Sequence, residues 1–358
     1  MSAQSSEAWS LVSHEKALVT RISVVKGPRK KPVKKTMLKS ALSVCLFSST
    51  LCLTVSAQTP LPAQAQPVQT VRSAQTAPST QPAPADQQPA TPQGTDPSLA
   101  SVRTGHSLPV PKDASLPTLF LVGDSTVRNG RGDGAQGQWG WGEPLVDYFD
   151  SSKINVVNRA LGGRSSRTYI TEGLWDETLR FVKPGDFVVF QFGHNDSGPL
   201  DDASRARGTL TGIGDETKEI DNPITKKHEV VHTYGWYMRK YVSDTLAKGA
   251  TPIICSPIPR KIWQDGKVVR NRDNYGGWAE QVAKQEGVAF IDLNGLIADR
   301  YDALGQAAVE PLFGDPHTHT SRAGAELNAE CVVQGLKALP GDPLAHDFSP
   351  KAESIVQR

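Results

Sequence analysis

Short apolar runs alternate with longer mixed segments between about residue 116 and residue 339 of this chain. The runs are rich in valine, isoleucine, leucine and phenylalanine, and glycine, proline, asparagine or aspartate bound each of them. Near-continuous apolar runs of this length are typical of strands that are buried on both faces of a parallel sheet. We therefore predict β-strands over residues 118–122, 154–158, 187–192, 251–255 and 289–292.

The segments between these runs have the length of helices, and we predict helices over residues 143–149, 171–181, 232–248, 275–286, 295–303 and 321–338. Strands that alternate with helices indicate an α/β protein, here a three-layer α/β/α sandwich around a five-stranded parallel sheet. Long loops follow the third and fourth strands, over residues 193–230 and 256–274. Such loops at the carboxyl edge of a sheet commonly form a binding site or a lid.

The N-terminal region has a different composition. Residues 1–57 begin with a basic stretch and continue into an uncharged, leucine-rich stretch that ends in the small residues before Gln58. This pattern predicts a secretory signal peptide that is cleaved near Ala57, with Met37 as an alternative start; a basic tail beside a buried helix is the other interpretation. We expect residues 58–114 to be a disordered linker rich in proline, glutamine and alanine, residues 115–340 to be one folded domain, and residues 341–358 to be a C-terminal tail.

Charge and cysteine content narrow the function classes. The formal net charge is only +2, so we expect no nucleic-acid partner, and we expect a monomer without a membrane span after cleavage. Cys255 and Cys331 remain in the mature part of the chain, where a disulfide or two buried thiols are both possible. No cluster has metal-ligand spacing and no glycine-rich phosphate loop is present, so we expect neither a metal nor an organic cofactor.

Four polar stretches carry the candidate chemistry. Ser125 follows the first strand, and it is either a nucleophile or a helix cap. The other stretches are residues 158–167 after the second strand, residues 193–196 after the third strand, and residues 314–321 before the last helix. Together they supply a serine, glycine backbone N–H groups, an asparagine amide and an Asp/His pair, which are the parts that acyl transfer requires.

These motifs and their order resemble the SGNH, or GDSL-type, hydrolases, and within them the rhamnogalacturonan acetylesterases. The resemblance rests on GDS at 123–125, ALGGRSSRT at 160–168, FGHND at 192–196 and HTHTSRAGAE at 317–326. It implies the flavodoxin-like α/β/α sandwich of SGNH hydrolases. It also implies that Ser125 is the nucleophile, that His319 is the general base, and that Ser125, Gly163 and Asn195 form the oxyanion hole.

The third member of the triad departs from the family pattern. The family places its aspartate three residues before the histidine, where this chain has Pro316. Asp315 lies one residue further back, and it orients His319 only if the loop is rearranged; otherwise a backbone carbonyl does so. His317 is the competing base. If His319 is the base, activity should rise as its imidazole loses a proton.

The resemblance implies a secreted or periplasmic serine esterase that removes acetyl groups from a plant cell-wall polysaccharide, foremost the rhamnogalacturonan of pectin. Arg164 and Arg167 could bind the carboxylates of an acidic sugar, or could form structural ion pairs. Trp141 could stack on a sugar ring or belong to the core, as could four other aromatic residues: Trp139, Tyr234, Trp236 and Trp263. The alternatives are an esterase for acetylated xylan or short-chain lipid or aryl esters, and a carbohydrate-binding protein without turnover.

Overall fold

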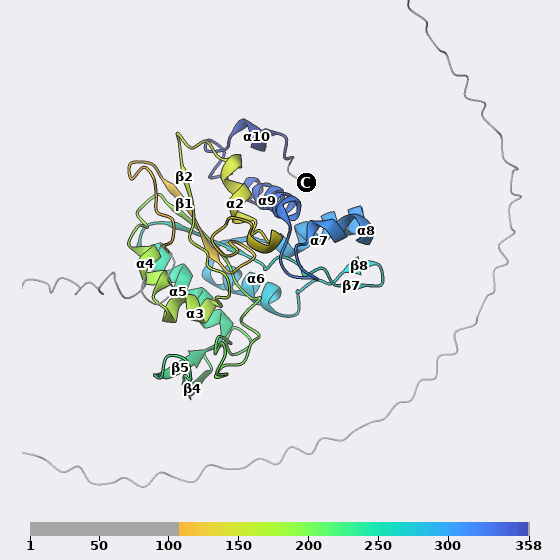
Figure 1. Ribbon diagram of the computed structural model, residues 1–358. Coiled ribbons are helices and arrows are strands. Elements are labelled where there is room, and N and C mark those ends of the chain that lie inside the picture. The colour runs from red at the N-terminus through yellow and green to blue at the C-terminus, as the bar shows by residue number, and fades with distance from the viewer. Residues whose placement is uncertain (1–106, 357–358) are drawn as a thin grey trace, which may run out of the picture. The chain divides into compact units, whose positions relative to one another are not determined.

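The computed structural model describes residues 107–356, so the expected signal peptide and most of the expected linker lie outside the described residues. Five parallel strands form the central sheet in the order β2-β1-β3-β6-β9, which confirms the α/β fold (Figure 1). Their bounds are β1 Thr118–Gly123, β2 Asn155–Asn158, β3 Phe187–Gln191, β6 Thr251–Cys255 and β9 Ala289–Ile291. All five match the predicted runs to within one residue at each end.

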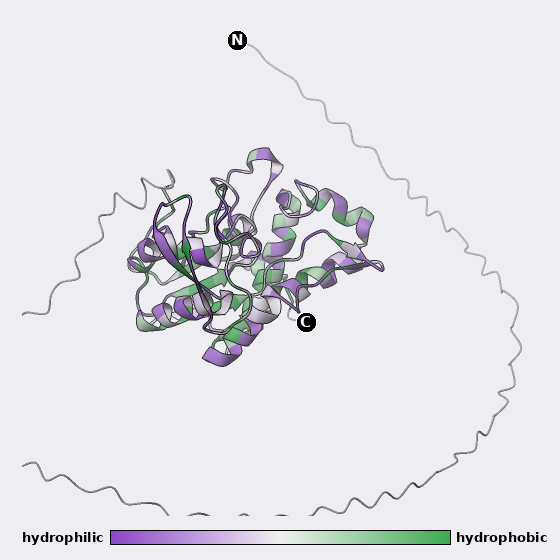
Figure 2. Ribbon diagram, turned by 90° about the horizontal axis from the view of Figure 1, so that it is seen from below, coloured by the Kyte–Doolittle hydropathy of each residue, from purple (hydrophilic) through white to green (hydrophobic). Residues whose placement is uncertain are grey.

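Successive side chains of a strand point to opposite faces of the sheet, so the core has two parts, one under each helical layer. Leu119 and Leu121 of β1 belong to the cluster that also contains residues of α2, α7 and α9. Phe120 and Val122 belong to the cluster beneath α3, α4, α5 and α6. The hydrophobic residues accordingly gather on the strands and inner helix faces in Figure 2. The bounds are α2 Gly142–Leu145, α3 Ser166–Thr171, α4 Leu174–Leu179, α5 Tyr234–Ala247, α6 Tyr275–Glu286, α7 Leu293–Leu304 and α9 Arg322–Lys337.

Two predicted helices differ from the structure. The segment 143–149 forms the short helix α2 followed by the 3₁₀ turn η2, Val146–Tyr148. The segment 171–181 is divided between α3 and α4, because Gly173 between them adopts a left-handed conformation with φ 80°. Helix α3 begins earlier than predicted, at the N-cap Ser165, whose hydroxyl accepts a hydrogen bond from the Thr168 N–H.

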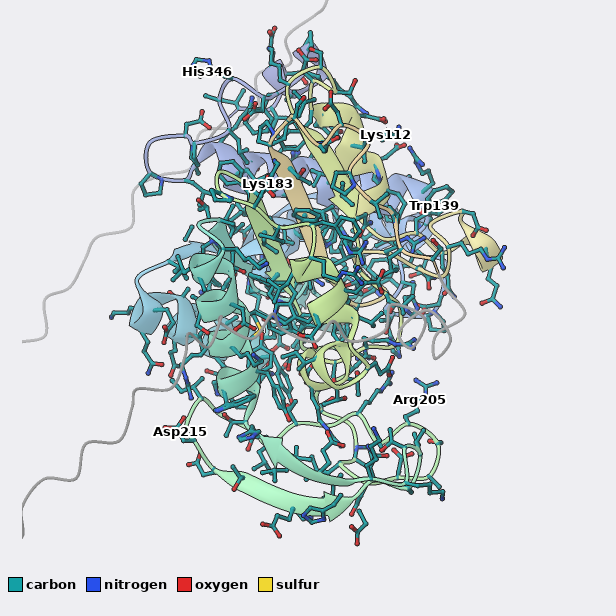
Figure 3. The ribbon with its side chains drawn as sticks, turned by 90° about the vertical axis from the view of Figure 1, so that its left-hand side faces the viewer. Lys112, Trp139, Lys183, Arg205, Asp215 and His346 are labelled. Carbon is teal, nitrogen blue, oxygen red and sulfur yellow. The ribbon has the colours of Figure 1, made fainter. Side chains whose placement is uncertain are left out.

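Both long loops contain a hairpin that the hydrophobic pattern did not predict. Strands β4, Thr217–Asp221, and β5, His228–His232, pair antiparallel and project from the body (Figure 1). Strands β7, Trp263–Gln264, and β8, Lys267–Val268, form a shorter hairpin that contacts α7. The labelled residues Arg205 and Asp215 lie near the β4–β5 hairpin in Figure 3.

The folded unit extends past both expected boundaries. Leu108 is buried, and the Pro109 carbonyl accepts a hydrogen bond from the Arg159 guanidinium at 2.7 Å. At the other end, Leu344 and Ala352 are fully buried, and the centroid of the Phe348 ring lies 5.0 Å from that of the Phe149 ring, so residues 341–356 pack against the core rather than forming a free tail. The remaining short elements are η1 Ala135–Gly137, α8 Gln306–Val309, η3 Glu310–Leu312 and α10 Pro350–Glu353.

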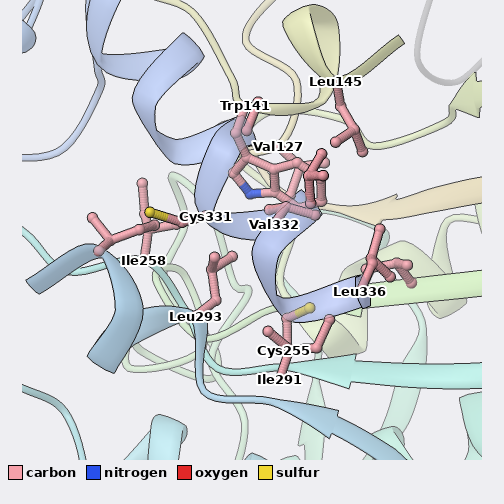
Figure 4. Packing of buried hydrophobic residues seen from close by; sticks show 14 of the residues in the cluster. Val127, Trp141, Leu145, Cys255, Ile258, Ile291, Leu293, Cys331, Val332 and Leu336 are labelled. Carbon is pink, nitrogen blue, oxygen red and sulfur yellow. The ribbon is translucent and has the colours of Figure 1, made fainter. Parts of the chain in front are cut away.

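Figure 4 shows the core beneath α9, where Trp141, Cys255 and Cys331 are packed among aliphatic side chains. Both thiols are free and buried, and burial raises the pKa of each, to about 12 for Cys331. Of the two alternatives for these cysteines, the structure therefore shows separate thiols. No helix among residues 107–356 has both the length and the apolar character needed to cross a membrane.

Candidate active site

Ser125 lies in a tight turn at the carboxyl end of β1. A side chain at Gly123 would come within 2.6 Å of the Gln191 carbonyl and of the Val127 side chain, so only glycine fits where the strand ends. Asp124 is fully buried, and its Oδ1 accepts hydrogen bonds from the N–H and hydroxyl of Thr126 at 2.8 and 2.7 Å. These contacts hold the turn that carries the Ser125 hydroxyl.

Trp141 supports this turn from the core and does not reach the cavity. Its side chain is fully buried, and its indole N–H donates to Gln191 Oε1 at 2.8 Å. The Gln191 amide in turn donates to the Thr126 hydroxyl at 2.6 Å. The prediction that Trp141 stacks on substrate is therefore wrong, because a fully enclosed indole cannot contact a sugar, and Trp141 belongs to the core instead.

His319 connects the serine to a carboxylate. Its Nε2 lies 2.9 Å from Ser125 Oγ, and its Nδ1 lies 2.6 Å from Asp315 Oδ2. An ionised carboxylate only accepts hydrogen bonds, so Nδ1 carries the proton and Nε2 is free to accept from the serine hydroxyl. These three side chains thus have the geometry that activates a serine nucleophile.

Asp315 reaches the imidazole because the backbone folds around it. Its Oδ1 accepts hydrogen bonds from three successive N–H groups, those of His317, Thr318 and His319, at 3.0, 2.6 and 3.0 Å. Burial by itself would raise the pKa of this carboxyl, but the backbone hydrogen bonds and the bond to the imidazole outweigh it and lower the pKa to about 2. The turn therefore brings an aspartate four residues before the histidine into contact with it.

His317 does not take part in this arrangement. Its side chain is exposed, and its Nδ1 lies 2.6 Å from the Thr318 hydroxyl. It is His319, and not His317, whose ring contacts Ser125.

The predicted oxyanion residues surround the same cavity as Ser125. Gly163 and Asn195 both line it. Gly163 has φ 81°, a conformation that favours glycine, and its carbonyl accepts a hydrogen bond from Arg207 at 3.0 Å. One N–H of the Asn195 amide donates to the Arg164 carbonyl at 2.8 Å, which leaves its second N–H for another acceptor.

Asp196 ties the loop after β3 to the loop after β2. Its Oδ1 accepts hydrogen bonds from both the N–H and the hydroxyl of Ser166, the first residue of α3. Burial raises the pKa of this carboxyl to about 7, although the bonds from Ser166 oppose the shift. Neighbouring His194 lines the cavity, and its Nε2 is buried without a hydrogen-bond partner.

Arg167 does not bind substrate, as one of its two predicted roles required, but forms a structural ion pair, which was the alternative. Its side chain is fully buried and forms a two-pronged ion pair with Glu229 of β5, with both N–O distances at 2.7 Å. It also donates to the carbonyls of Leu200 and Gly208. Arg164 does line the cavity, but Glu172 pairs with it at 2.9 Å, so its charge is already compensated.

The cavity around Ser125 has a volume of about 700 Å³ and contains three further cations that the sequence motifs did not single out. Among residues 107–356, Arg205, Arg207 and Arg260 form no ion pair with a carboxylate. Each comes from one of the two long loops, and loop length was the only indication in the sequence. In the same part of the chain, no three His, Cys, Asp or Glu side chains are grouped so as to hold a metal ion.

A parallel α/β/α sandwich with this Ser–His–Asp geometry at its carboxyl edge defines a class, the serine hydrolases of the SGNH fold. The sequence profile of the GDSL-like lipase/acylhydrolase family matches residues 121–327. The chain belongs to this family and is a carboxylic ester hydrolase.

Similar proteins agree with this assignment. A rhamnogalacturonan acetylesterase of Emericella nidulans is 32% identical over 64% of this chain and 89% of its own length. A probable rhamnogalacturonan acetylesterase of Bacillus subtilis, YesY, is 31% identical over 64% of this chain and 96% of its own length. The crystal structure of Bacillus subtilis YxiM superposes with a TM-score of 0.51 and 25% identity, covering 63% of this chain and 57% of that one.

Proposed function

We propose that this chain removes acetyl groups from an acetylated plant cell-wall polysaccharide, the rhamnogalacturonan of pectin, through an acetyl-enzyme on Ser125. The observation that carries the proposal is the continuous contact from Ser125 through His319 to Asp315 at the wall of the open cavity. Two relatives that align over most of their length are named as a rhamnogalacturonan acetylesterase and a probable rhamnogalacturonan acetylesterase, which supports the substrate class.

In this mechanism Ser125 Oγ attacks the acetyl carbonyl and His319 Nε2 accepts its proton. Asp315 stabilises the resulting imidazolium through Nδ1. The backbone N–H groups of Ser125 and Gly163 and the second amide N–H of Asn195 stabilise the oxyanion. His319 then returns the proton to the departing sugar hydroxyl. Water then attacks the acetyl-enzyme while His319 Nε2 accepts its proton, and return of that proton to Ser125 Oγ releases acetate and restores the serine hydroxyl.

The charge of the cavity favours an acidic polysaccharide over a neutral one. Arg205, Arg207 and Arg260 face the space beside Ser125 without a carboxylate partner among the described residues. A galacturonate unit supplies the missing carboxylate, and arginine suits it because the guanidinium can donate two parallel hydrogen bonds. The xylose backbone of xylan is uncharged and would leave the three cations uncompensated.

Secretion or periplasmic export is part of the proposal and rests on the basic and apolar pattern of residues 1–57 alone. A polymeric substrate cannot enter the cell, which is consistent with export. We propose that the mature enzyme acts as a monomer, since Ser125, His319 and Asp315 all come from one chain.

The test is acetate release by the wild type and by Ser125→Ala from acetylated rhamnogalacturonan, acetylated xylan and an aryl acetate. We expect release from rhamnogalacturonan well above release from xylan, and its loss in the variant. Release from xylan or from the aryl ester alone would retain the esterase and overturn the pectin substrate. If no substrate gives Ser125-dependent release while the polysaccharide still binds, the protein is a carbohydrate-binding protein and not an enzyme.

A further inference from the structure

A second cavity of about 500 Å³ adjoins the cavity that contains Ser125. His194 and Arg260 line both, so these two side chains form the boundary between them. The second cavity lies between the segment after β6, the β7–β8 hairpin and the start of α6. None of the groups assigned to acyl transfer above lines it, so that chemistry does not account for it.

The wall of the second cavity is apolar where the hairpin flanks it. Ile262 and Val269 are 45% and 40% exposed, and both line the cavity together with Pro257 and Pro259. The Val269 N–H donates to the Ile262 carbonyl at 2.8 Å, so the two residues lie opposite each other at the base of the hairpin. Exposed aliphatic side chains that line one concave surface indicate a ligand with an apolar face.

The electrostatics of the second cavity differ from those of the first. Its other cation, Arg270, is compensated by Asp299 and by Asp302, with 2.9 Å between Arg270 Nη2 and Asp302 Oδ2. The Asn274 side chain is exposed in the cavity and does not cap helix α6, so its amide is free to bind a hydroxyl group. Away from Arg260 at its boundary with the first cavity, the second cavity therefore suits an uncharged part of a ligand that has both hydroxyl groups and an apolar face.

We propose that the second cavity is a subsite for the uncharged sugar unit next to the acetylated acidic unit. The proposal rests on the proposed function, because it places a continuous polysaccharide chain across both cavities. The acidic unit lies beside Arg205 and Arg207, the chain crosses the boundary at His194 and Arg260, and the neighbouring neutral unit contacts Ile262 and Val269. The enzyme then acts best on chains in which charged and uncharged sugars adjoin.

The test uses the double variant Ile262→Ser/Val269→Ser of the full chain, which replaces exposed side chains and leaves the core intact. We measure the ratio of kcat/KM on acetylated rhamnogalacturonan oligosaccharides to kcat/KM on an aryl acetate. We expect this ratio to fall at least about fivefold, mainly through KM, because each side chain loses apolar contact with the sugar. Leu304→Ser, which changes a 49% exposed leucine on α7 outside both cavities, is the control and should leave the ratio unchanged.

An unchanged ratio in the double variant, with Ser125-dependent hydrolysis intact, overturns the subsite and leaves the proposed function standing. If the wild type hydrolyses no ester, the proposed function fails, and the subsite is tested by binding instead. Calorimetry then compares the affinity of deacetylated rhamnogalacturonan oligosaccharides for Ser125→Ala and for Ser125→Ala that also carries Ile262→Ser/Val269→Ser. Equal affinities overturn the subsite, and an affinity weakened at least about fivefold by the added substitutions supports it.

Discussion

Replacing Asp315 by asparagine separates the two tasks of this residue. The asparagine carbonyl can still accept the three backbone hydrogen bonds that hold the turn. Its amide group then faces His319 Nδ1, where the carboxylate lay at 2.6 Å. An amide N–H needs an acceptor, so it favours the tautomer that carries the proton on Nε2. That tautomer cannot take the proton of Ser125, which lies 2.9 Å away.

The expected effect on the reaction is large and the effect on folding is small. The wrong tautomer, together with loss of the negative charge beside the developing imidazolium, should lower kcat by about 10³- to 10⁴-fold, as in other serine triads. At about 1.36 kcal/mol for each factor of ten, this equals about 4 to 5.5 kcal/mol of transition-state stabilisation. The turn keeps its backbone hydrogen bonds, so the free energy of unfolding should change by about 1 kcal/mol.

The assay is initial-rate hydrolysis of an aryl acetate, with thermal unfolding of the same preparations. Asp315→Ala should lose kcat to a similar extent and should also lose stability, because it removes the acceptor for the three N–H groups. His317→Gln is the control on the same loop, and its kcat should remain within about twofold of the wild type, because its ring does not contact Ser125. If Asp315→Asn keeps more than about a tenth of the wild-type kcat, the carboxylate does not orient His319.

Three further predictions concern charge. Arg207→Gln/Arg260→Gln should lower kcat/KM on acetylated rhamnogalacturonan about tenfold more than on acetylated xylan, because only the former offers a carboxylate to the lost cations. Glu229→Gln should lower the free energy of unfolding by about 2 to 4 kcal/mol in denaturant titrations, because it leaves the fully buried Arg167 without its ion pair. Burial raises the pKa of Glu143 from 4.5 to about 8 despite the charge of a nearby arginine. The protonated form of Glu143 therefore contributes its full stability below about pH 4.5, and this contribution is lost progressively as the pH rises from about 4.5 through about 8. The melting temperature should fall across this range, and less so in Glu143→Gln.

Each of these predictions has a contrary outcome. Arg300→Gln is the control for the first prediction, because it removes a cation that pairs with Glu330 outside both cavities. If it loses as much preference for rhamnogalacturonan over xylan as Arg207→Gln/Arg260→Gln does, net charge alone determines that preference. Glu229→Gln with unchanged stability would mean that the carbonyls of Leu200 and Gly208 suffice for Arg167. Identical pH profiles of the melting temperature for the wild type and Glu143→Gln would place the titrating group elsewhere.

The strands could be predicted from the sequence because a strand buried on both faces must be apolar along its whole length. All five therefore stood out as runs between turn residues. The β4–β5 hairpin could not be found in this way, because most residues of Thr217–Asp221 are exposed and polar. The predicted helix over 171–181 missed the break at Gly173, since a single glycine within a helical pattern does not by itself indicate where a helix ends.

For the site, the resemblance of four local motifs to those of SGNH hydrolases singled out Ser125, Gly163, Asn195 and His319, because each motif is a short contiguous stretch that can be matched without knowing the fold. Only the tertiary structure decided how distant charges pair. Arg167 and Arg207 are both arginines near glycine-rich loops, but Glu229, 62 residues from Arg167, neutralises one and no carboxylate among the described residues neutralises the other. Likewise, the contact between Asp315 and His319 depends on three backbone N–H groups that converge on one carboxylate oxygen. Residue type and spacing do not specify such convergence, because it arises from the path of the folded backbone.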